Sequence, residues 1–320
     1  MLGEFGSHCL AAAFLGEQPS FALADGTLRR FGTEIDCVRV HAAGSLAAAR
    51  VGAGEALLTG GEDGRVCRVE ADGATREVAA VARKWITAVG ESRGQLAYAS
   101  GKTVWLRGAG AARELPHTRG VKGIAFSRDG KHLAVAQQDS VSLHDLETAG
   151  ASLELAWNDI HVASTFSPDG RFLVIASQNC FLHGWRLSDR KHFRMLGYQT
   201  KVGDWSWTDA GGHLATSGAS AAIVWPFDSD DGPMTRSAVE VGARNGRIVT
   251  AVAWRPRTTL LAIGYDDGRV ELAGVDEPLS TRPLREGGRA AVTSIAWNAD
   301  GSRVAFGSAV GECGVTALPS

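Results

Sequence analysis

Positively charged residues recur at one point of a repeating sequence pattern and are the most suggestive candidates for chemistry. Guanidinium and ammonium groups bind carboxylates and other anions, and a group of them would concentrate positive potential where an acidic segment of a partner could dock. Asp159 occupies the same point in a further copy of the pattern and interrupts the series. Docking cations and independently solvated loop charges both stay open as interpretations. The cations are Lys84, Arg119 and Arg247 at one aligned position, with Lys201 and Arg289 one residue to either side.

Trp85 directly follows Lys84 in the same predicted loop. Tryptophan and arginine dominate the energetics of many protein interfaces. The residue is therefore either an exposed anchor for a partner or a core tryptophan, and the sequence favours neither.

Metal ligation and catalysis find little support in the residue pattern. Cys37 and His41 are four residues apart on a predicted strand, about 13 Å at about 3.3 Å per residue, too far to share one metal ion. The acidic pairs Glu62-Asp63, Asp230-Asp231 and Asp266-Asp267 fall in predicted turns, where aspartate favours local backbone hydrogen bonds. No nucleophile elbow, phosphate loop, zinc motif or dinucleotide fingerprint is present. We therefore expect no catalytic residue, no cofactor and no metal, and predict that the protein is not an enzyme.

Composition excludes several classes of partner. The chain has 320 residues with a net charge of −2, whereas nucleic-acid binders and polybasic membrane-surface proteins carry an excess of Lys and Arg. No apolar stretch approaches a membrane span, and the N-terminus has no basic region of a secretory signal. Five scattered cysteines without a CxxC pair predict free thiols in a reducing compartment. We expect a cytoplasmic protein that binds neither nucleic acid nor membrane.

A repeat organises the whole chain. The segment FSPDGRFLVIAS, residues 166–177, has the form of an apolar strand, a turn and a second strand, and related segments surround it. Eight such units in 320 residues average 40 residues each. Because no linker interrupts them, we predict a single domain over residues 1–320. The clearest register marks are the aromatic residues Phe126, Phe166, Trp207, Trp254 and Trp297.

Each unit reads as four short strands. Apolar runs of four to six residues are broken by Gly, Asp, Asn or Ser, a pattern typical of short strands separated by turns. Asp25-Gly26, Asp63-Gly64 and Asp267-Gly268 suit tight hairpin turns. A four-stranded sheet of this size must stack on its neighbours to bury both faces, so the units predict an all-β propeller of antiparallel blades. Eight blades are expected, with seven as the alternative. The last unit lacks a fourth strand, which Met1 to Gly6 would supply by pairing beside Gly314 to Leu318.

The third strands give the chain its family resemblance. Aligned on VSLHDL at 141–146, they read TVWLRG at 103–108, HGWRL at 183–187 and IVWPF at 223–227. The chain resembles the WD-repeat β-propellers, in which this strand commonly ends in Trp-Asp. Only Asp145 keeps the aspartate, and this departure predicts blades that depend more on apolar packing than on the family's hydrogen-bonded tetrad of Asp, His, Ser and Trp. The residues at the tryptophan position are Trp105, His144, Trp185 and Trp225.

The resemblance implies an interaction scaffold that binds a protein partner through rim loops, through an acidic segment if the cations above act together. We expect the protein to be a monomer unless it is part of a complex. A permanent structural subunit of a larger complex would differ from such a scaffold only in the lifetime of the complex. The alternative is a small-ligand or metal sensor, or an enzyme, that uses the central channel. The predicted innermost strands are rich in alanine, and Glu91 and Asp204 are their only prominent carboxylates, which favours the scaffold.

Overall fold

The structure is a computed structural model that describes residues 1–52, 54–108, 112–148 and 152–318. These residues form thirty β-strands and no helix, which confirms the all-β class. Their contacts group into two compact units. Unit 1 contains Met1–Arg39 and Gly197–Ser320, and unit 2 contains Val40–Leu196. The single-domain assignment stays a prediction, and the two units are described separately.

Burial changes systematically across each sheet. The second strand is buried along most of its length, as in β7 (Ala56–Gly61) and β17 (Phe172–Ser177), whose residues are all buried. The fourth strand is mainly exposed, as in β5 (Ile35–Arg39). Strands covered on both faces read as continuous apolar runs and outer strands as polar ones, so the sequence pattern follows the position of the strand in its sheet.

Unit 1 holds four antiparallel sheets of four strands each. The first is β2 (Cys9–Leu15), β3 (Gln18–Leu23), β4 (Thr27–Phe31) and β5. The second is β20 (Trp205–Trp207), β21 (His213–Thr216), β22 (Ala222–Pro226) and β23 (Val239–Val241). The third is β24 (Val249–Trp254), β25 (Leu260–Tyr265), β26 (Val270–Gly274) and β27 (Thr281–Arg285). The fourth is β28 (Val292–Trp297), β29 (Arg303–Ser308), β30 (Glu312–Ala317) and β1 (Leu2–Glu4).

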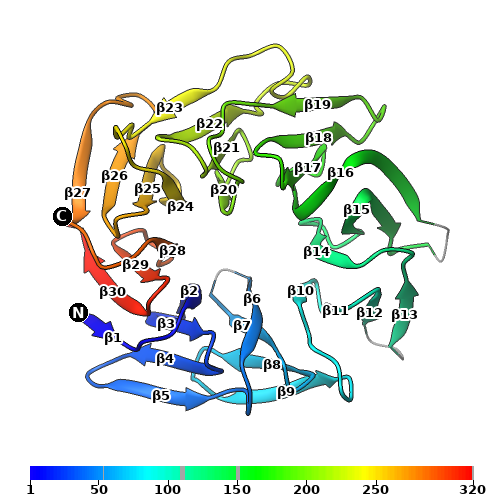
Figure 1. Cartoon of the computed structure of the whole chain (residues 1–320), viewed down its shortest axis with the longest axis horizontal. Coiled ribbons are helices and arrows are strands. Elements are labelled where there is room, and N and C mark those ends of the chain that lie inside the picture. The colour runs from blue at the N-terminus through cyan, green and yellow to red at the C-terminus, as the bar shows by residue number, and fades with distance from the viewer. Residues whose placement is uncertain (53, 109–111, 149–151, 319–320) are drawn as a thin grey trace. The chain divides into compact units, whose positions relative to one another are not determined.

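The N-terminal strand completes the last sheet, as the sequence predicts. Strand β1 pairs antiparallel with β30 in the register Leu2 to Gly314 and Glu4 to Glu312, and Figure 1 shows the two strands side by side. The Val315 amide also donates to the Met1 carbonyl at 3.0 Å. Residues from opposite ends of the chain therefore share one sheet, which removes an exposed edge from β30.

Unit 2 holds two sheets of four strands and one of six. The first is β6 (Ser45–Val51), β7, β8 (Arg65–Glu70) and β9 (Thr75–Ala80). The second is β10 (Ala88–Ser92), β11 (Gln95–Ser100), β12 (Thr103–Arg107) and β13 (Arg113–Pro116). The six-stranded sheet is β14 (Val121–Phe126), β15 (His132–Asp145), β16 (Leu153–Phe166), β17, β18 (Leu182–Arg186) and β19 (His192–Met195).

The described residues thus form seven connected sheets rather than the eight separate four-stranded blades expected, because two of the eight sequence units share the six-stranded sheet. The six-stranded sheet contains two sequence units. Strand β15 folds back at Asp139, whose φ is +70°. The bend brings the side-chain amide of Gln137 close enough to donate to the Ser142 hydroxyl at 2.8 Å, whereas an extended strand would separate these residues by about 16 Å. Strand β16 runs without a break from one unit into the next. It pairs with β15 up to Ile160 and with β17 from His161 onward, so both units belong to one sheet.

Apolar packing fills the sheets, but the expected scarcity of polar tetrads is only partly correct. In the sheet β6–β9 the buried His41 contacts Asp63 through Nδ1 at 3.0 Å and Thr59 through Nε2 at 2.9 Å. In the sheet β20–β23 the Trp225 indole donates to the Tyr198 hydroxyl at 2.7 Å. At least two sheets therefore have polar contacts between side chains of the kind that a tetrad provides, and aligning the third strands alone does not reveal them.

Candidate interaction site

The loop of residues 81–87, between β9 and β10, is clamped at both ends. The Val81 amide donates to the Gly64 carbonyl at 2.8 Å, and the Ile86 amide donates to the Gly61 carbonyl at 3.1 Å. Gly64 has φ +79°, and a Cβ atom there would lie 2.3 Å from the Val81 carbonyl oxygen. The Asp63-Gly64 turn expected from the sequence therefore also contacts this loop closely, and glycine at position 64 allows that contact.

The clamp places two large neighbouring side chains in opposite environments. Ile86 is fully buried in the core of unit 2, whereas Trp85 is 61% exposed. The Lys84 ammonium lies 5.5 Å from the centre of the Trp105 ring, close enough for a cation–π contact. Trp85 is therefore not a core tryptophan, and its role as an anchor for a partner stays a prediction.

Further cations lie at the same end of the sheet β10–β13 as Trp85. The turn between β11 and β12 is tied to the loop after β13, since the His117 amide donates to the Lys102 carbonyl and the Val121 amide to the Gly101 carbonyl, each at 2.8 Å. Residues 81–88, 100–104 and 117–122 contain no acidic residue. Their exposed cations are Arg83, Lys84, Lys102, Arg119 and Lys122, and we call these five with Trp85 the Trp85 rim.

Three carboxylates, Glu62, Asp63 and Asp139, lie next to the five cations of the Trp85 rim, so positive charge is in excess there. Arg119 approaches Asp139 at 3.8 Å but keeps 60% of its side chain exposed. A surface pair of this kind is worth about 0–1 kcal/mol. In the adjacent β7–β8 turn, Asp63 is engaged by His41, and Glu62 is exposed. Two of the cations predicted from the sequence, Lys84 and Arg119, therefore belong to a basic surface in unit 2.

The other three predicted cations lie in unit 1, in differing environments. Lys201 is exposed, and no ion pair to its side chain occurs within the described parts of the chain. Arg247 is held by two carboxylates, at 3.3 Å from Asp267 and 3.9 Å from Asp266. The acidic pair read from the sequence as turn chemistry thus also neutralises a predicted docking cation.

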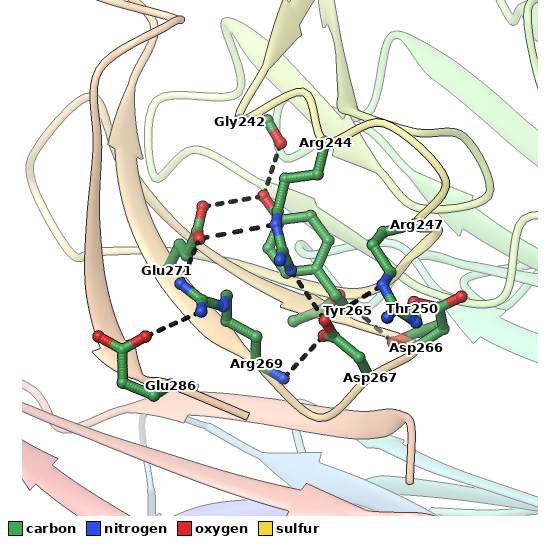
Figure 2. A network of polar contacts seen from close by, with 11 residues as sticks. Gly242, Arg244, Arg247, Thr250, Tyr265, Asp266, Asp267, Arg269, Glu271 and Glu286 are labelled. Atoms are coloured by element: carbon green, nitrogen blue, oxygen red, sulfur yellow. Dashed lines mark hydrogen bonds and ion pairs between the residues drawn. The ribbon is translucent and has the colours of Figure 1, made fainter. Parts of the chain in front are cut away.

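Arg247 belongs to a larger polar network around Arg244, shown in Figure 2. Arg244 lies 3.1 Å from Asp267, 3.9 Å from the buried Glu271 and 5.0 Å from the centre of the Tyr265 ring. The Tyr265 hydroxyl donates to the Gly242 carbonyl at 2.6 Å, and burial raises the pKa of that hydroxyl. Burial alone would raise the pKa of Asp267, but the Arg269 amide and the Arg244 guanidinium outweigh it and hold that pKa below its ordinary value. The network links charges that would be costly to bury singly and so acts as a structural fastener.

Arg289 is neutralised in a similar way. Its guanidinium lies 2.6 Å from Glu4 and 3.4 Å from Glu312, and Arg285 approaches Glu312 from another side at 3.2 Å. Burial would raise the pKa of Glu312, but the Arg289 amide and the Arg285 guanidinium lower it overall. Arg289 thus braces the junction of β1 and β30, where two carboxylates already contact it.

No group of three His, Cys, Asp or Glu side chains suited to a metal ion occurs within the described ranges. The five cysteines are free thiols, as expected, and Cys37 is exposed. No helix long and apolar enough to cross a membrane is found among the described residues.

Arg83 and Lys102 were missed by sequence alignment. Arg83 adjoins Lys84, which already fills the aligned position in that unit, and it adopts φ +58°, a conformation that the sequence does not signal. Lys102 lies in a turn between β11 and β12, and aligning only the residues before first strands excludes such turns. A search of all loops at one end of each predicted sheet would have found both.

Comparisons with known proteins identify the fold class. No family model matches the chain, and no curated protein matches it. A solved structure of the computationally designed Ika8 protein is similar with a TM-score of 0.77 and 18% identity, over 98% of both chains. A chain of a mitotic checkpoint complex is similar with a TM-score of 0.66 and 15% identity, over 83% of this chain and 84% of that one. At such identities the likeness shows the fold alone, and with the seven sheets it defines a β-propeller, as the repeat predicts.

Proposed function

We propose that this protein is a non-enzymatic interaction scaffold and that the Trp85 rim is its docking face for an acidic segment of a partner protein. The observation that carries the proposal is the fixed exposure of Trp85, 61% accessible beside a fully buried Ile86. A tryptophan displayed beside cations combines an apolar anchor with charge, as at many binding hot spots. A loop whose backbone is held by hydrogen bonds also loses less entropy on binding than a mobile loop.

Charge specifies the partner further. Five exposed cations belong to the Trp85 rim, and the segments that carry them contain no acidic residue. Such a surface would speed the association of an acidic segment and reject basic ones, while the tryptophan would supply the apolar contact. Lys201, Arg247 and Arg289 are not included in this docking face. Binding of a protein rather than nucleic acid or membrane, a cytoplasmic location and a monomeric state outside the complex are part of the same proposal.

We further propose that the chain is a divergent WD-repeat protein. The contacts of His41 with Asp63 and Thr59 support it, because they reproduce three positions of the family's tetrad with threonine in place of serine. Cys67 takes the place of the tryptophan, because it pairs across the sheet with Thr59 as Trp105 pairs with Tyr98 in the next sheet.

The test compares protein capture from an extract of the source cells by four tagged forms. These are the native protein, Trp85→Ala, Lys84→Glu and the control Leu279→Ala, which removes a side chain that is 87% exposed in unit 1. We expect one protein to co-purify in stoichiometric amount with the native and control forms and to be lost from the other two. Loss of binding as salt is raised would support the charge component.

Two results would contradict the proposal. Equal capture by native protein and Trp85→Ala would place the partner elsewhere on the surface. Equal loss with Leu279→Ala would show that any apolar truncation has the effect, so the Trp85 rim would have no special role.

A further inference from the structure

A cavity of about 610 Å³ lies in unit 2, where three consecutive first strands end. Its walls come from β6, β10 and β14 and from the connections that follow each of them. The β10–β11 connection bounds the end of the sheet β10–β13 opposite to the Trp85 rim, because antiparallel strands alternate in direction. The volume is within the range of small-molecule sites.

The cavity combines an apolar floor with arginines. Val89 is buried, whereas Ile124 and Phe126 remain half-buried and so present apolar surface to the cavity. Each of the three connections adds one exposed arginine at or beside the strand end: Arg50, Arg93 and Arg128. An aromatic surface within reach of several guanidinium groups suits a ligand that is apolar at one end and anionic at the other.

Two carboxylates also line the cavity, and they do not cancel its charge. Glu91 is bound by Arg68, which also pairs with Glu70 at 2.9 Å. The Glu55 side chain lies against Gly52 in the β6–β7 connection. With Glu91 compensated from outside the cavity, the lining has an excess of positive charge.

Arg93 is the most informative of the three arginines. It forms a two-residue hairpin turn with Gly94, and both residues have positive φ, +50° and +75°. Glycine or asparagine would adopt the Arg93 conformation with less strain, and strain of this kind at a charged residue is typical of functional positions. Among the described residues, no hydrogen bond or ion pair to the Arg93 guanidinium is present, so its donors are available to a ligand.

Contacts between neighbouring sheets fix the wall that carries Arg93. Its side-chain stem passes so close to Gly130 that a Cβ atom there would meet Arg93 Cγ at 2.8 Å. The Ser92 hydroxyl donates to the Ser127 carbonyl and the Gln95 amide to the Gly130 carbonyl, each at 3.4 Å. The β10–β11 and β14–β15 connections are thereby joined, which positions Arg93 and Arg128 on one wall.

We propose that this cavity binds a small organic anion with an aromatic body, its acidic group held by Arg93 and Arg128 and its ring lying over Phe126 and Ile124. The ligand class follows from the lining alone: a carboxylate, sulfonate or phosphate ester carried on an apolar ring. The proposal is independent of the Trp85 rim.

The test is isothermal titration of the full chain with three probes. We expect 1-naphthalenesulfonate to bind in equimolar amount, while 1-naphthalenemethanol, which lacks the charge, and inorganic sulfate, which lacks the ring, each bind at least about tenfold more weakly. Arg93→Gln, Arg128→Gln and Phe126→Ala should each weaken 1-naphthalenesulfonate binding about tenfold or more. Arg190→Gln, a control at an exposed arginine of the β18–β19 turn in the same unit, should bind like the native protein.

Several outcomes would overturn this proposal. One is the absence of a binding signal for 1-naphthalenesulfonate at about 1 mM. Another is unchanged affinity in both Arg93→Gln and Arg128→Gln, and a third is equal weakening in Arg190→Gln. Melting temperatures would identify a misfolded variant, and Arg93→Lys, which keeps the charge, should then retain most of the affinity if the site is correct. Trp85→Ala should leave probe binding unchanged, so failure here and failure of the scaffold proposal remain distinguishable.

Discussion

Replacing His183 by phenylalanine should make the protein less sensitive to acid. His183 lies in β18 and is fully buried, with its ring stacked on Trp157 at 3.8 Å between centroids and edge-on to Trp185 at 4.4 Å. Within the described parts of the chain, neither ring nitrogen has a hydrogen-bond partner. Burial, with smaller effects of His192, His161 and Arg194, lowers the pKa of His183 from 6.5 to about 3.

The size of the effect follows from that difference in pKa. Between about pH 6.5 and pH 3 the unfolded chain binds a proton at this position and the folded chain does not, so the free energy of unfolding falls as the pH falls. With these two pKa values, His183 accounts for a loss of about 2 kcal/mol between pH 7 and pH 5 and about 3 kcal/mol between pH 7 and pH 4. The contribution of neutral His183 to the free energy of unfolding is fully present only above the pKa of this histidine in the unfolded chain.

Urea unfolding at pH 7 and pH 5, followed by far-UV circular dichroism, measures this difference. His183→Phe keeps an aromatic ring in the stack and removes the titration, so its loss between the two pH values should be smaller by about 2 kcal/mol than that of the native protein. His8→Phe, at an exposed histidine, should leave the pH dependence unchanged. Equal losses in the native protein and His183→Phe would refute the assignment of a neutral buried imidazole.

Three further predictions concern the glycine clamp, the polar network and the thiols. Gly64→Ala should destabilise the protein by about 1–3 kcal/mol and speed hydrogen exchange at the Ile86 amide. The control Gly170→Ala is also at positive φ but has open space around it, and it should leave the exchange rate of the Ile86 amide unchanged. Tyr265→Phe removes the 2.6 Å bond to the Gly242 carbonyl and should cost about 1–3 kcal/mol in urea unfolding, while Tyr98→Phe, with no such bond, should cost clearly less. Ellman's reagent should label exposed Cys37 rapidly and spare Cys9, Cys67 and Cys313 until urea is added, since these three are buried and burial raises the pKa of Cys67 to about 11. Rapid labelling of all thiols in the native state would contradict their burial.

The repeat made the fold predictable from the sequence. Strand, turn and strand recur in each unit, and the missing fourth strand of the last unit pointed to Met1–Gly6, which the pairing of β1 with β30 confirms. The joining of two units into one sheet was not predictable, because it depends on β16 continuing from Leu153 to Phe166 through a segment whose residues also suit a turn.

The environment of the candidate cations could not be derived from their spacing. Arg289 pairs with Glu4, which is 285 residues away in the sequence. Arg247 is neutralised by an acidic pair assigned to turn chemistry alone. Local pattern identified the loops, but long-range pairing decides which of their charges are available, and the exposure of Trp85 depends on a clamp from another strand pair.

Photo-crosslinking from the Trp85 rim in living cells would test the central claim most directly. With p-benzoylphenylalanine placed at position 85, irradiation should crosslink one partner protein, and mass spectrometry should locate the crosslink within or beside an acidic segment of that partner. The same photoreactive residue placed at position 279 in unit 1 provides the background. A crosslinking pattern at position 85 that matches this background, or a partner captured through a basic segment, would contradict the account of the Trp85 rim as an acidic-segment docking face.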